Sequence, residues 1–285
     1  MKCDCVCPAC NKPLIAKKGE KNIHHFAHYK SIDCLGGLET ALHKLSKELI
    51  EKCTHFTTPE LYYPNTKYLI YEEQKIPVDS VTLEKKIGGI IPDIVIYSGK
   101  KILLIEIVVN NEISWPKLRK IRELNLPVIE VSSKHMIKGL YLKQDFFLRD
   151  DSFTHELLNG TKYKTWVHNP KVSSIKNELK SNYAEQKEVK FFKSDELGYY
   201  YYVEECPLEK RSWNSGRNKG KPYASAEHDC KSCQACVGMD YKTKNFKNRT
   251  TSIEYPKSVY CLGYMNSEIS GLIKAIGKGT MPNNT

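Results

Sequence analysis

A strongly apolar segment in the middle of the chain limits the folds open to it, because it holds two acids. Residues 90–111 read IIPDIVIYSGKKILLIEIVVNN, with Asp93 and Glu106 as the only carboxylates. Two runs of strand-forming residues flank Gly99 and Lys100, a pair that suits a two-residue type II′ turn. The segment is therefore predicted to be a β-hairpin. An acid inside such a strand costs free energy unless it is paired or binds a cation.

The turn also predicts which residues of the hairpin face each other. With Gly99 and Lys100 as the loop, paired positions have numbers that sum to 199, so Asp93 faces Glu106 with Cβ atoms roughly 5 Å apart. A divalent cation between them would remove their repulsion and use both carboxylates as ligands. Asn110, on the face of Glu106, is placed to hydrogen-bond a water or a phosphate there. The alternative is a surface acid and a salt-bridged strand residue.

The segments around the hairpin predict an α/β domain. A helical pattern covers LETALHKLSKELIEKC (38–53), and Glu39 and His43 share a face of it because they are four residues apart. Glu39 is a candidate third metal ligand, and His43 a candidate contact to phosphate or water. Further strands are expected at 78–87 and 126–133, and a helix at 114–125 with Ser114 as N-cap. The order helix, strands, helix, strand predicts a mixed sheet flanked by helices.

Ten of the eleven cysteines lie near the two ends of the chain. The start MKCDCVCPAC has no apolar core of a signal peptide, so we expect a cytoplasmic protein, in which disulfides are rare and clustered cysteines indicate zinc. Five side chains compete for four places in an N-terminal zinc site. We favour three of them, with either His25 or Cys34 as the fourth ligand. The three favoured residues are Cys7, Cys10 and His28.

A second cysteine group lies near the C-terminus. Cys230, Cys233 and Cys236 are spaced three apart, with Cys206 and Cys261 on either side. An iron–sulfur cluster is the rival interpretation of this run. We favour zinc, because the run lacks a fourth nearby cysteine followed by proline.

The charge of the chain indicates an anionic partner. The net charge is +11 and the isoelectric point about 9.0, which is typical of nucleic-acid-binding proteins. No apolar run is long enough to span a membrane. Residues 151–200 are rich in lysine with interspersed aromatics, and they are either a solvated linker or a nucleic-acid contact in which Trp166 or Tyr163 stacks on bases.

Several motifs together resemble the competence protein CoiA-like nucleases of the PD-(D/E)XK superfamily. They are CPAC, KPLIAKKGEKNIHHFAH, LETALHKLSK and PDIVI followed by ILLIEIVVNNEI, within residues 5–130. The resemblance implies a PD-(D/E)XK-like fold and a Mg²⁺- or Mn²⁺-dependent deoxyribonuclease that acts as an endonuclease or exonuclease in DNA uptake, processing or defence. It implies that Glu39, Asp93 and Glu106 form the metal site, and that His43 and Lys47 occupy further motif positions.

The chain departs from the superfamily at Val108, where a lysine is usual and CoiA-like proteins often have glutamine. The alternative function is therefore a catalytically weak or inactive nucleic-acid-binding adaptor that keeps the nuclease fold. Lys117, in the first turn of the helix after the hairpin, is our candidate replacement, and Lys47 is the second choice. The resemblance also nominates four cysteines for a second structural zinc ion and leaves Cys236 spare. These four are Cys206, Cys230, Cys233 and Cys261.

We expect four regions along the chain. They are a zinc finger-like module (1–36), a nuclease-like domain (37–150), a basic connecting region (151–200) and a cysteine-rich, zinc ribbon-like module (201–285). The expected partners are single- or double-stranded DNA, together with recombination or DNA-processing proteins.

Overall fold

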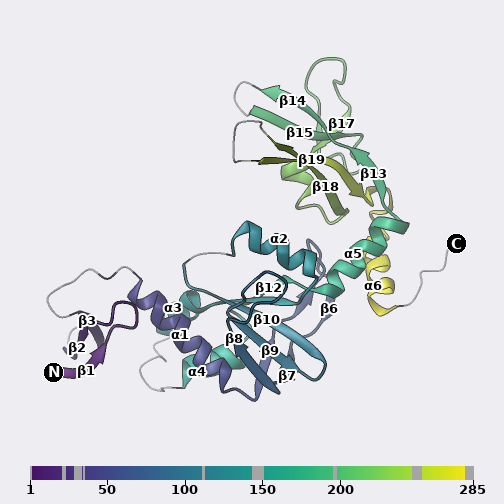
Figure 1. Cartoon of the computed structure of the whole chain (residues 1–285). Coiled ribbons are helices and arrows are strands. Elements are labelled where there is room, and N and C mark those ends of the chain that lie inside the picture. The colour runs from purple at the N-terminus through teal and green to yellow at the C-terminus, as the bar shows by residue number, and fades with distance from the viewer. Residues whose placement is uncertain are drawn as a thin grey trace. The chain divides into compact units, whose positions relative to one another are not determined.

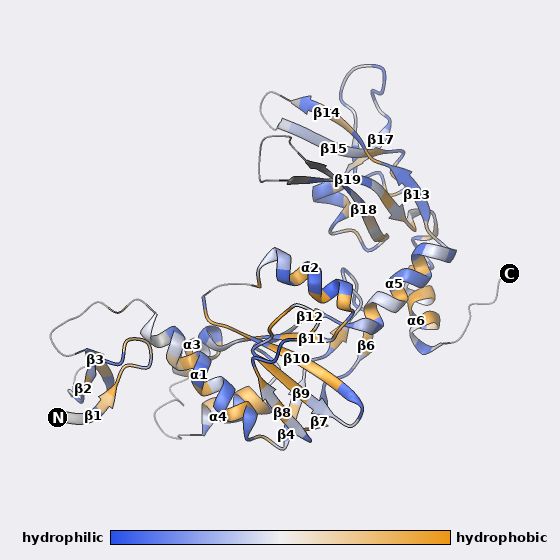
Figure 2. Cartoon of the chain, viewed as in Figure 1, coloured by the Kyte–Doolittle hydropathy of each residue, from blue (hydrophilic) through white to orange (hydrophobic). Residues whose placement is uncertain are grey.

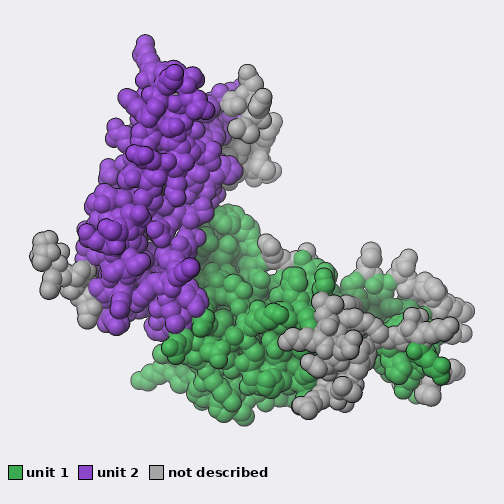
Figure 3. All heavy atoms as spheres, turned by 180° about the vertical axis from the view of Figure 1, so that it is seen from behind, with its two compact units in different colours: residues 1–60, 72–169 green, residues 61–71, 170–285 purple. Residues whose placement is uncertain are grey.

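The computed structural model describes residues 2–20, 24–28, 34, 36–110, 113–142, 151–194, 198–245 and 252–279. These residues form two compact units (Figure 3). The first contains Met1–Glu60 and Glu72–Asn169, and the second Leu61–Tyr71 and Pro170–Thr285. The boundary between the two units, at Asn169 and Pro170, falls within the expected connecting region 151–200.

The first unit is a mixed α/β structure, as expected. Its largest sheet has the strand order β12-β11-β10-β9-β8, in which β10 and β11 are parallel and every other neighbouring pair is antiparallel. A three-stranded antiparallel sheet, β1-β2-β3, forms the N-terminal part. The elements of this unit are β1 (Lys2–Val6), β2 (Pro13–Lys17), β3 (His25–His28), α1 (Gly37–Glu51), β4 (His55–Thr58), β7 (Gln74–Pro77), β8 (Ser80–Leu83), β9 (Ile94–Ser98), β10 (Lys101–Val108), α2 (Trp115–Leu124), β11 (Val128–Ser132), α3 (Ser133–Leu142), α4 (Ser152–Leu158) and β12 (Lys164–His168).

Helices cover both faces of the five-stranded sheet, which explains why β10 is apolar along most of its length (Figures 1 and 2). Leu104 of β10 packs on the α2 side with Ile121. Ile105 and Ile107 point the other way, into the core that the sheet shares with α1, α3 and α4. A strand buried on both faces needs apolar residues at odd and even positions alike. Glu106 is the exception within this pattern.

The predicted register of the hairpin is confirmed. Lys101 pairs with Ser98, and the pairing continues to Ile105 opposite Ile94, so every pair sums to 199. Gly99 has φ +57°, whereas Lys100 does not have a positive φ, which is the sign pattern of a type II′ turn. Local turn chemistry therefore sets the pairing that leads back to Asp93 and Glu106.

In its described residues, the second unit contains two larger sheets, one two-stranded sheet and two longer helices. The sheets have the orders β13-β19-β18 and β14-β15-β17-β16, and β5 pairs with β6. A core of α5, α6 and β18 side chains lies beside them. The elements are β5 (Leu61–Tyr62), β6 (Leu69–Tyr71), α5 (Pro170–Asn182), β13 (Glu185–Glu188), β14 (Lys190–Ser194), β15 (Gly198–Glu204), β16 (Arg211–Ser212), β17 (Pro222–Ser225), η2 (Ala226–Cys230), β18 (Cys236–Asn245), β19 (Ser252–Cys261), η3 (Gly263–Met265) and α6 (Ile269–Lys278).

The two aromatic side chains considered for base stacking have structural positions instead. Trp166 of β12 packs against the core of the first unit, and its Nε1–H donates a hydrogen bond to the carbonyl of Pro59 at 3.0 Å. Tyr163 packs against the same core. The linear pattern of lysines and aromatics did not reveal that these rings face inward. Among the described residues, no helix is long and apolar enough to cross a membrane.

Lys164 is a charged group in the core of the first unit. It is 5% exposed, and its Nζ donates to the carbonyl oxygen of Thr57 at 2.7 Å. Burial lowers its pKa to about 7, against the opposing influence of the Glu156 carboxylate. The unfolded chain keeps this proton to a much higher pH, so between pH 7 and about 10 it binds more protons than the folded chain. Stability contributed by this site therefore rises with pH.

We predict that Lys164→Met removes this pH dependence. Between pH 7 and 9, the free energy of unfolding of the wild type should rise relative to that of the variant by about 1.4 kcal/mol per pH unit. Urea denaturation at several pH values measures the difference. Lys162→Met, at an exposed position two residues away, is the matched control and should follow the wild type. Parallel pH curves for wild type and Lys164→Met would contradict the prediction.

Candidate active site and metal centres

Glu106 is the most unusual acid of the sheet. It is 5% exposed, on the face of β10 that packs against α2. Its Oε2 accepts a hydrogen bond from Nζ of Lys117 at 2.7 Å, whereas its Oε1 is buried without a hydrogen-bond partner. Burial raises the pKa of Glu106, although the ammonium group of Lys117 opposes the rise. An unpaired buried carboxylate oxygen is costly, so it indicates a position meant to accept a further partner.

Asp93 lies just before β9 and has a different environment. The register places it opposite Glu106, one position beyond the last pair. Its Oδ2 accepts the backbone N–H of Ile107 at 2.9 Å, and its Oδ1 lies 3.0 Å from Nε2 of His43 and 3.2 Å from Nζ of Lys47. Burial alone would raise its pKa, but the hydrogen bonds from His43 and Ile107 and the nearby cationic charges lower the pKa to about 2. Asp93 is therefore held as a carboxylate.

Lys117 approaches Glu106 from the first turn of α2. Ser114 is at the N-cap position as predicted, but its side chain makes no capping hydrogen bond. Besides Glu106, Nζ of Lys117 donates to the carbonyl of Ile91 at 2.9 Å. This second bond ties the lysine to the chain that leads into Asp93. Val108, the last residue of β10, supplies no charge here.

Glu39 of α1 is engaged separately. Its Oε2 accepts from Nδ2 of Asn110 at 2.7 Å, and Oδ1 of Asn110 accepts from Nζ of Lys134 at 2.6 Å. Asn110, expected to contact water or phosphate, is thus hydrogen-bonded between Glu39 and Lys134. The structure does not gather Glu39, Asp93 and Glu106 into one tight group of ligand atoms, and within the described residues only the N-terminal cysteines and histidine form such a group. Each acid instead has its own donor.

Glu84 is a neighbour of this site that the sequence did not single out. Its Oε1 accepts from Nζ of Lys47 at 2.7 Å, and its backbone N–H donates to the carbonyl of Asp93 at 3.0 Å. The hydrogen bond from Lys47 lowers the pKa of Glu84. The pairing of Leu83 with Ile94 puts Glu84 beside Asp93. The sequence holds the signal for this register: Gly88 and Gly89 form a two-residue turn between the bridged Ile87 and Ile90, whose numbers sum to 177 as those of Leu83 and Ile94 do. Glu84 was missed because this turn did not enter the predicted register.

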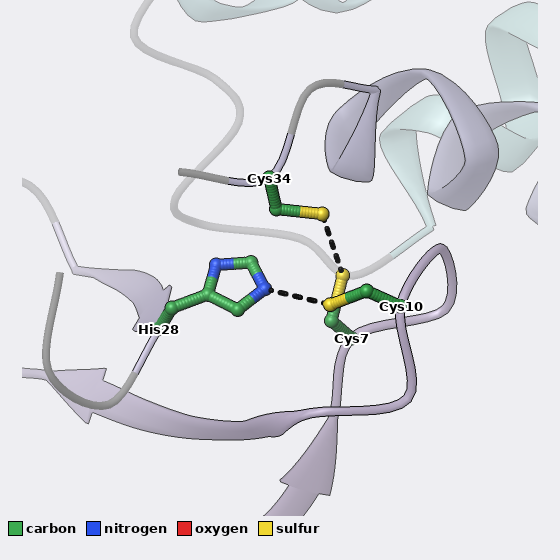
Figure 4. Close-up of side chains that lie close together, drawn as sticks. All are labelled: Cys7, Cys10, His28 and Cys34. Carbon is green, nitrogen blue, oxygen red and sulfur yellow. Dashed lines mark hydrogen bonds between the residues drawn. The ribbon is translucent and has the colours of Figure 1, made fainter. Parts of the chain in front are cut away.

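The candidate metal site near the N-terminus is closely assembled (Figure 4). Sγ of Cys7 lies 3.7 Å from Sγ of Cys34, and Sγ of Cys10 lies 3.3 Å from Nε2 of His28. All four ligand atoms lie within 4.8 Å of one another, and three sulfurs with one imidazole nitrogen suit tetrahedral zinc. A hydrogen bond from the backbone N–H of Ala9 lowers the pKa of Cys7 to about 6, which favours the thiolate form that binds metal.

Strand geometry decides between the two candidates for the fourth ligand. His25 and His28 both lie on β3, and side chains three residues apart on a strand point to opposite faces. His28 reaches the cysteines, so His25 does not join them, and Cys34 completes the group. Of the two alternatives for the fourth ligand, it is Cys34 and not His25 that lies in this group.

The C-terminal cysteines gather around one small cavity. The cavity, of about 20 Å³, is lined by all five of them. They do not form a group as tight as the N-terminal one. Burial raises the pKa values of Cys230 and Cys261, and that of Cys236 to about 11. Sγ of Cys236 also contacts the carbonyl oxygen of Gly238 at 3.6 Å. The five cysteines are Cys206, Cys230, Cys233, Cys236 and Cys261.

We predict that zinc binding at the N-terminal site depends on His28 and not on His25. His28→Ala should lower the zinc content by about one equivalent per chain, because it removes one of four ligands. His25→Ala is the matched control and should retain the zinc of the wild type. Elemental analysis of protein purified without added metal measures both. Equal losses in the two variants would contradict the assignment of Cys34 as the fourth ligand.

Residues 1–36 match the family model described as Competence protein CoiA, N-terminal domain. The matched segment contains β1, β2 and β3 together with all four residues of the N-terminal metal site. The comparison with curated proteins and the comparison with solved structures found no match. The N-terminal segment is thus similar to the first domain of competence protein CoiA.

Proposed function

We propose that the protein is a metal-dependent DNA nuclease that hydrolyses phosphodiester bonds. The observation that carries the proposal is Glu106, a buried acid with one oxygen bound to Lys117 and the other without a partner. Purely structural buried acids are normally fully hydrogen-bonded. A carboxylate that lacks one partner beside a second carboxylate, Asp93, fits a site for a hard divalent cation.

The order of elements in the first unit supports this proposal. Helix α1, the antiparallel strands β8, β9 and β10, helix α2 and the parallel strand β11 follow one another in the order expected for a PD-(D/E)XK-like domain. The similarity of residues 1–36 to a competence protein domain supports a competence-related role in the uptake or processing of DNA, and defence is a further role for such an enzyme. The net charge of +11 suits a polyanionic substrate.

The cation would be Mg²⁺ or Mn²⁺, held by Asp93 and Glu106. Asp93 is already ionised, and Glu106 offers a buried oxygen that needs a partner. Glu39 is the proposed third ligand, released from Asn110. When bound, such an ion polarises the phosphate and lowers the pKa of the attacking water.

The cationic side chains supply the rest of the site. Lys117 is proposed to place its positive charge beside the scissile phosphate, in place of the lysine that Val108 does not provide. His43 and Lys47 hold Asp93 from α1, and Glu84 fixes Lys47 in turn. These contacts keep the Asp93 carboxylate oriented and ionised, which is what positions it as a ligand.

An adaptor that binds nucleic acid without cutting it is the second candidate. One observation favours it: both central acids are already paired with cationic side chains of the chain itself. A metal ion that displaced Lys117 from Glu106 would break a buried ion pair, which costs free energy. With Lys117 in place, one oxygen of Glu106 already has a partner without any metal. Cleavage and metal binding discriminate between the two candidates.

We predict that the nuclease activity depends on the acids and on Lys117. In a Mn²⁺-supported cleavage assay with labelled single- and double-stranded DNA, Asp93→Ala and Glu106→Ala should lose about 100-fold or more of the rate. Lys117→Ala should lose at least about tenfold, because a charge close to the reacting phosphate is removed. Lys120→Ala, on the same helix but exposed, is the matched control and should cut like the wild type.

Two outcomes would contradict parts of this prediction. If the wild type cuts no faster than Glu106→Ala, the nuclease proposal is wrong and the adaptor remains. If both acid variants are inactive and Lys117→Ala cuts like Lys120→Ala, the proposed metal site is supported and the proposed role of Lys117 is wrong. Binding of Mn²⁺ to wild type and Glu106→Ala, measured as a thermal shift, separates lost metal from lost chemistry.

We also propose a second structural zinc ion, held by four of the five C-terminal cysteines. Zinc content should approach two equivalents per chain. Cys233→Ser should remove one equivalent and destabilise the second unit, whereas Cys236→Ser should keep the metal, because Cys236 bonds to the backbone at Gly238. If the protein instead contains iron with a visible charge-transfer absorption, the site holds an iron–sulfur cluster and the zinc proposal is wrong. If Cys236→Ser loses metal, Cys236 is one of the ligands.

A further inference from the structure

Strands β14 and β15 form a hairpin that is unusually rich in aromatic side chains. Their sequences are KFFKS and GYYYYVE. In the register, Phe191 faces Tyr201 and Lys193 faces Tyr199. Residues that face each other across an antiparallel pair share one side of the sheet. The hairpin therefore has two aromatic sides, one with Phe191 and one with Phe192.

The Phe192 side is packed more closely: Phe192 is 39% exposed, against 60% for Phe191. Phe192 contacts Tyr202 and Trp213 with ring centroids 5.9 and 6.0 Å apart, and Trp213 stacks on Tyr223 at 4.2 Å. These rings contact one another and so cover part of each other's surface. This side of the hairpin is part of the structure of the second unit.

The Phe191 side is open. Phe191 is 60% exposed and Tyr199 is 56% exposed, although both rings are large and apolar. The rings form a continuous row: Tyr199 to Phe191 at 5.7 Å, Phe191 to Tyr201 at 6.1 Å, and Tyr201 to Tyr255 of β19 at 6.0 Å with nearly parallel planes. We call Tyr199, Phe191, Tyr201 and Tyr255 the aromatic row.

The row leads into a groove of the second unit. The groove has a volume of about 420 Å³, and Phe191 and Tyr255 line it together with Lys242 and Lys257. The backbone N–H of Val189 donates to the carbonyl of Lys257 at 2.9 Å, which fixes the start of β14 against β19. The groove is therefore built by paired backbone, and its volume is within the range of small-ligand sites.

Positive charge accompanies the row. Lys193 faces Tyr199, Lys242 faces Tyr255, and Lys257, at a β-bulge of β19, lines the groove beside Tyr255. All three lysines are exposed, and none of them forms an ion pair with an acid in the described part of the chain. One acid, Glu188, also lines the groove. Exposed aromatic faces beside unpaired lysines are the two components of a surface that binds unpaired bases and the phosphates between them.

We propose that the aromatic row and its groove bind single-stranded nucleic acid. Bases would stack on the exposed rings of Phe191 and Tyr199 and enter the groove against Tyr255, while the three lysines contact phosphates. A duplex hides the faces of its bases, so the row favours single strands. This binding goes beyond the proposed cleavage and does not depend on Asp93 or Glu106.

The test measures binding by fluorescence anisotropy with the full chain, its zinc retained and no Mg²⁺ or Mn²⁺ added. The probes are a labelled dT15, the corresponding rU15 and a 15-base-pair DNA duplex. Wild type should bind the single strands more tightly than the duplex. Phe191→Ala and Tyr199→Ala should each weaken binding by roughly 5- to 100-fold, and Phe191→Trp should restore it. Tighter binding of rU15 than of dT15 would support the groove with RNA as its ligand.

Tyr241→Ala is the matched control. Tyr241 is 46% exposed on β18, next to Lys242 in sequence and so on the opposite side of that strand. It should bind like the wild type. Replacing Lys193, Lys242 and Lys257 by alanine together should lower the slope of log affinity against log salt by about 2. The proposal is overturned if the double variant Phe191→Ala/Tyr199→Ala binds with wild-type affinity. It is also overturned if the wild type binds duplex and single strand equally well.

Because no cleavage is measured, failure here leaves the nuclease proposal intact. Conversely, a protein that binds dT15 through Phe191 but never cuts DNA would refute the nuclease and keep this inference. The two proposals rest on different units of the chain and fail separately.

Discussion

The burial of Glu106 beside Lys117 is the interaction on which the first unit depends. A central strand covered on both faces requires apolar residues throughout, and a single acid there is tolerated only with a fixed cation. Helix α2 supplies that cation from its first turn, and the carbonyl of Ile91 holds its other side. The position at which α2 begins, just after Ser114, therefore matters more than its length: one turn later, Glu106 would have neither of its oxygens paired.

The pKa values of the two central acids are shifted in opposite directions. Asp93 receives hydrogen bonds and positive charge from several sides and stays ionised to a pH of about 2. Glu106 has one partner and is deeply buried, so its pKa is raised. Two carboxylates whose environments separate their pKa values are a common feature of catalytic sites, because neighbouring acids of equal strength would repel or share a proton. This difference supports the proposed function.

The features of the fold and the site that the sequence predicts are those set by interactions between residues close together in the chain. The hairpin register followed from Gly99 and Lys100 alone, since a two-residue turn fixes the pairing of both strands. Strand periodicity could have excluded His25, but only once β3 was known to be a strand. The engagement of Glu39 by Asn110 and Lys134 joins three separate elements, so no local pattern contains it. Likewise, Trp166 and Phe191 both lie near lysines in sequence, and only tertiary packing places the first against the core and leaves the second exposed.

In the proposed nuclease site, Lys117 takes the place of the strand lysine that Val108 does not supply. What such a site requires is a positive charge at one point in space, and the position of that charge in the sequence is secondary. A lysine at the end of β10 would reach the site along the sheet, whereas Lys117 reaches Glu106 from the helix that covers it. The long aliphatic stem of lysine makes both routes possible, because the stem can pack on apolar surface while the ammonium group reaches a carboxylate. With Lys117 in place, a second lysine at position 108 would add like charge close to it, so an apolar residue there is the compatible choice.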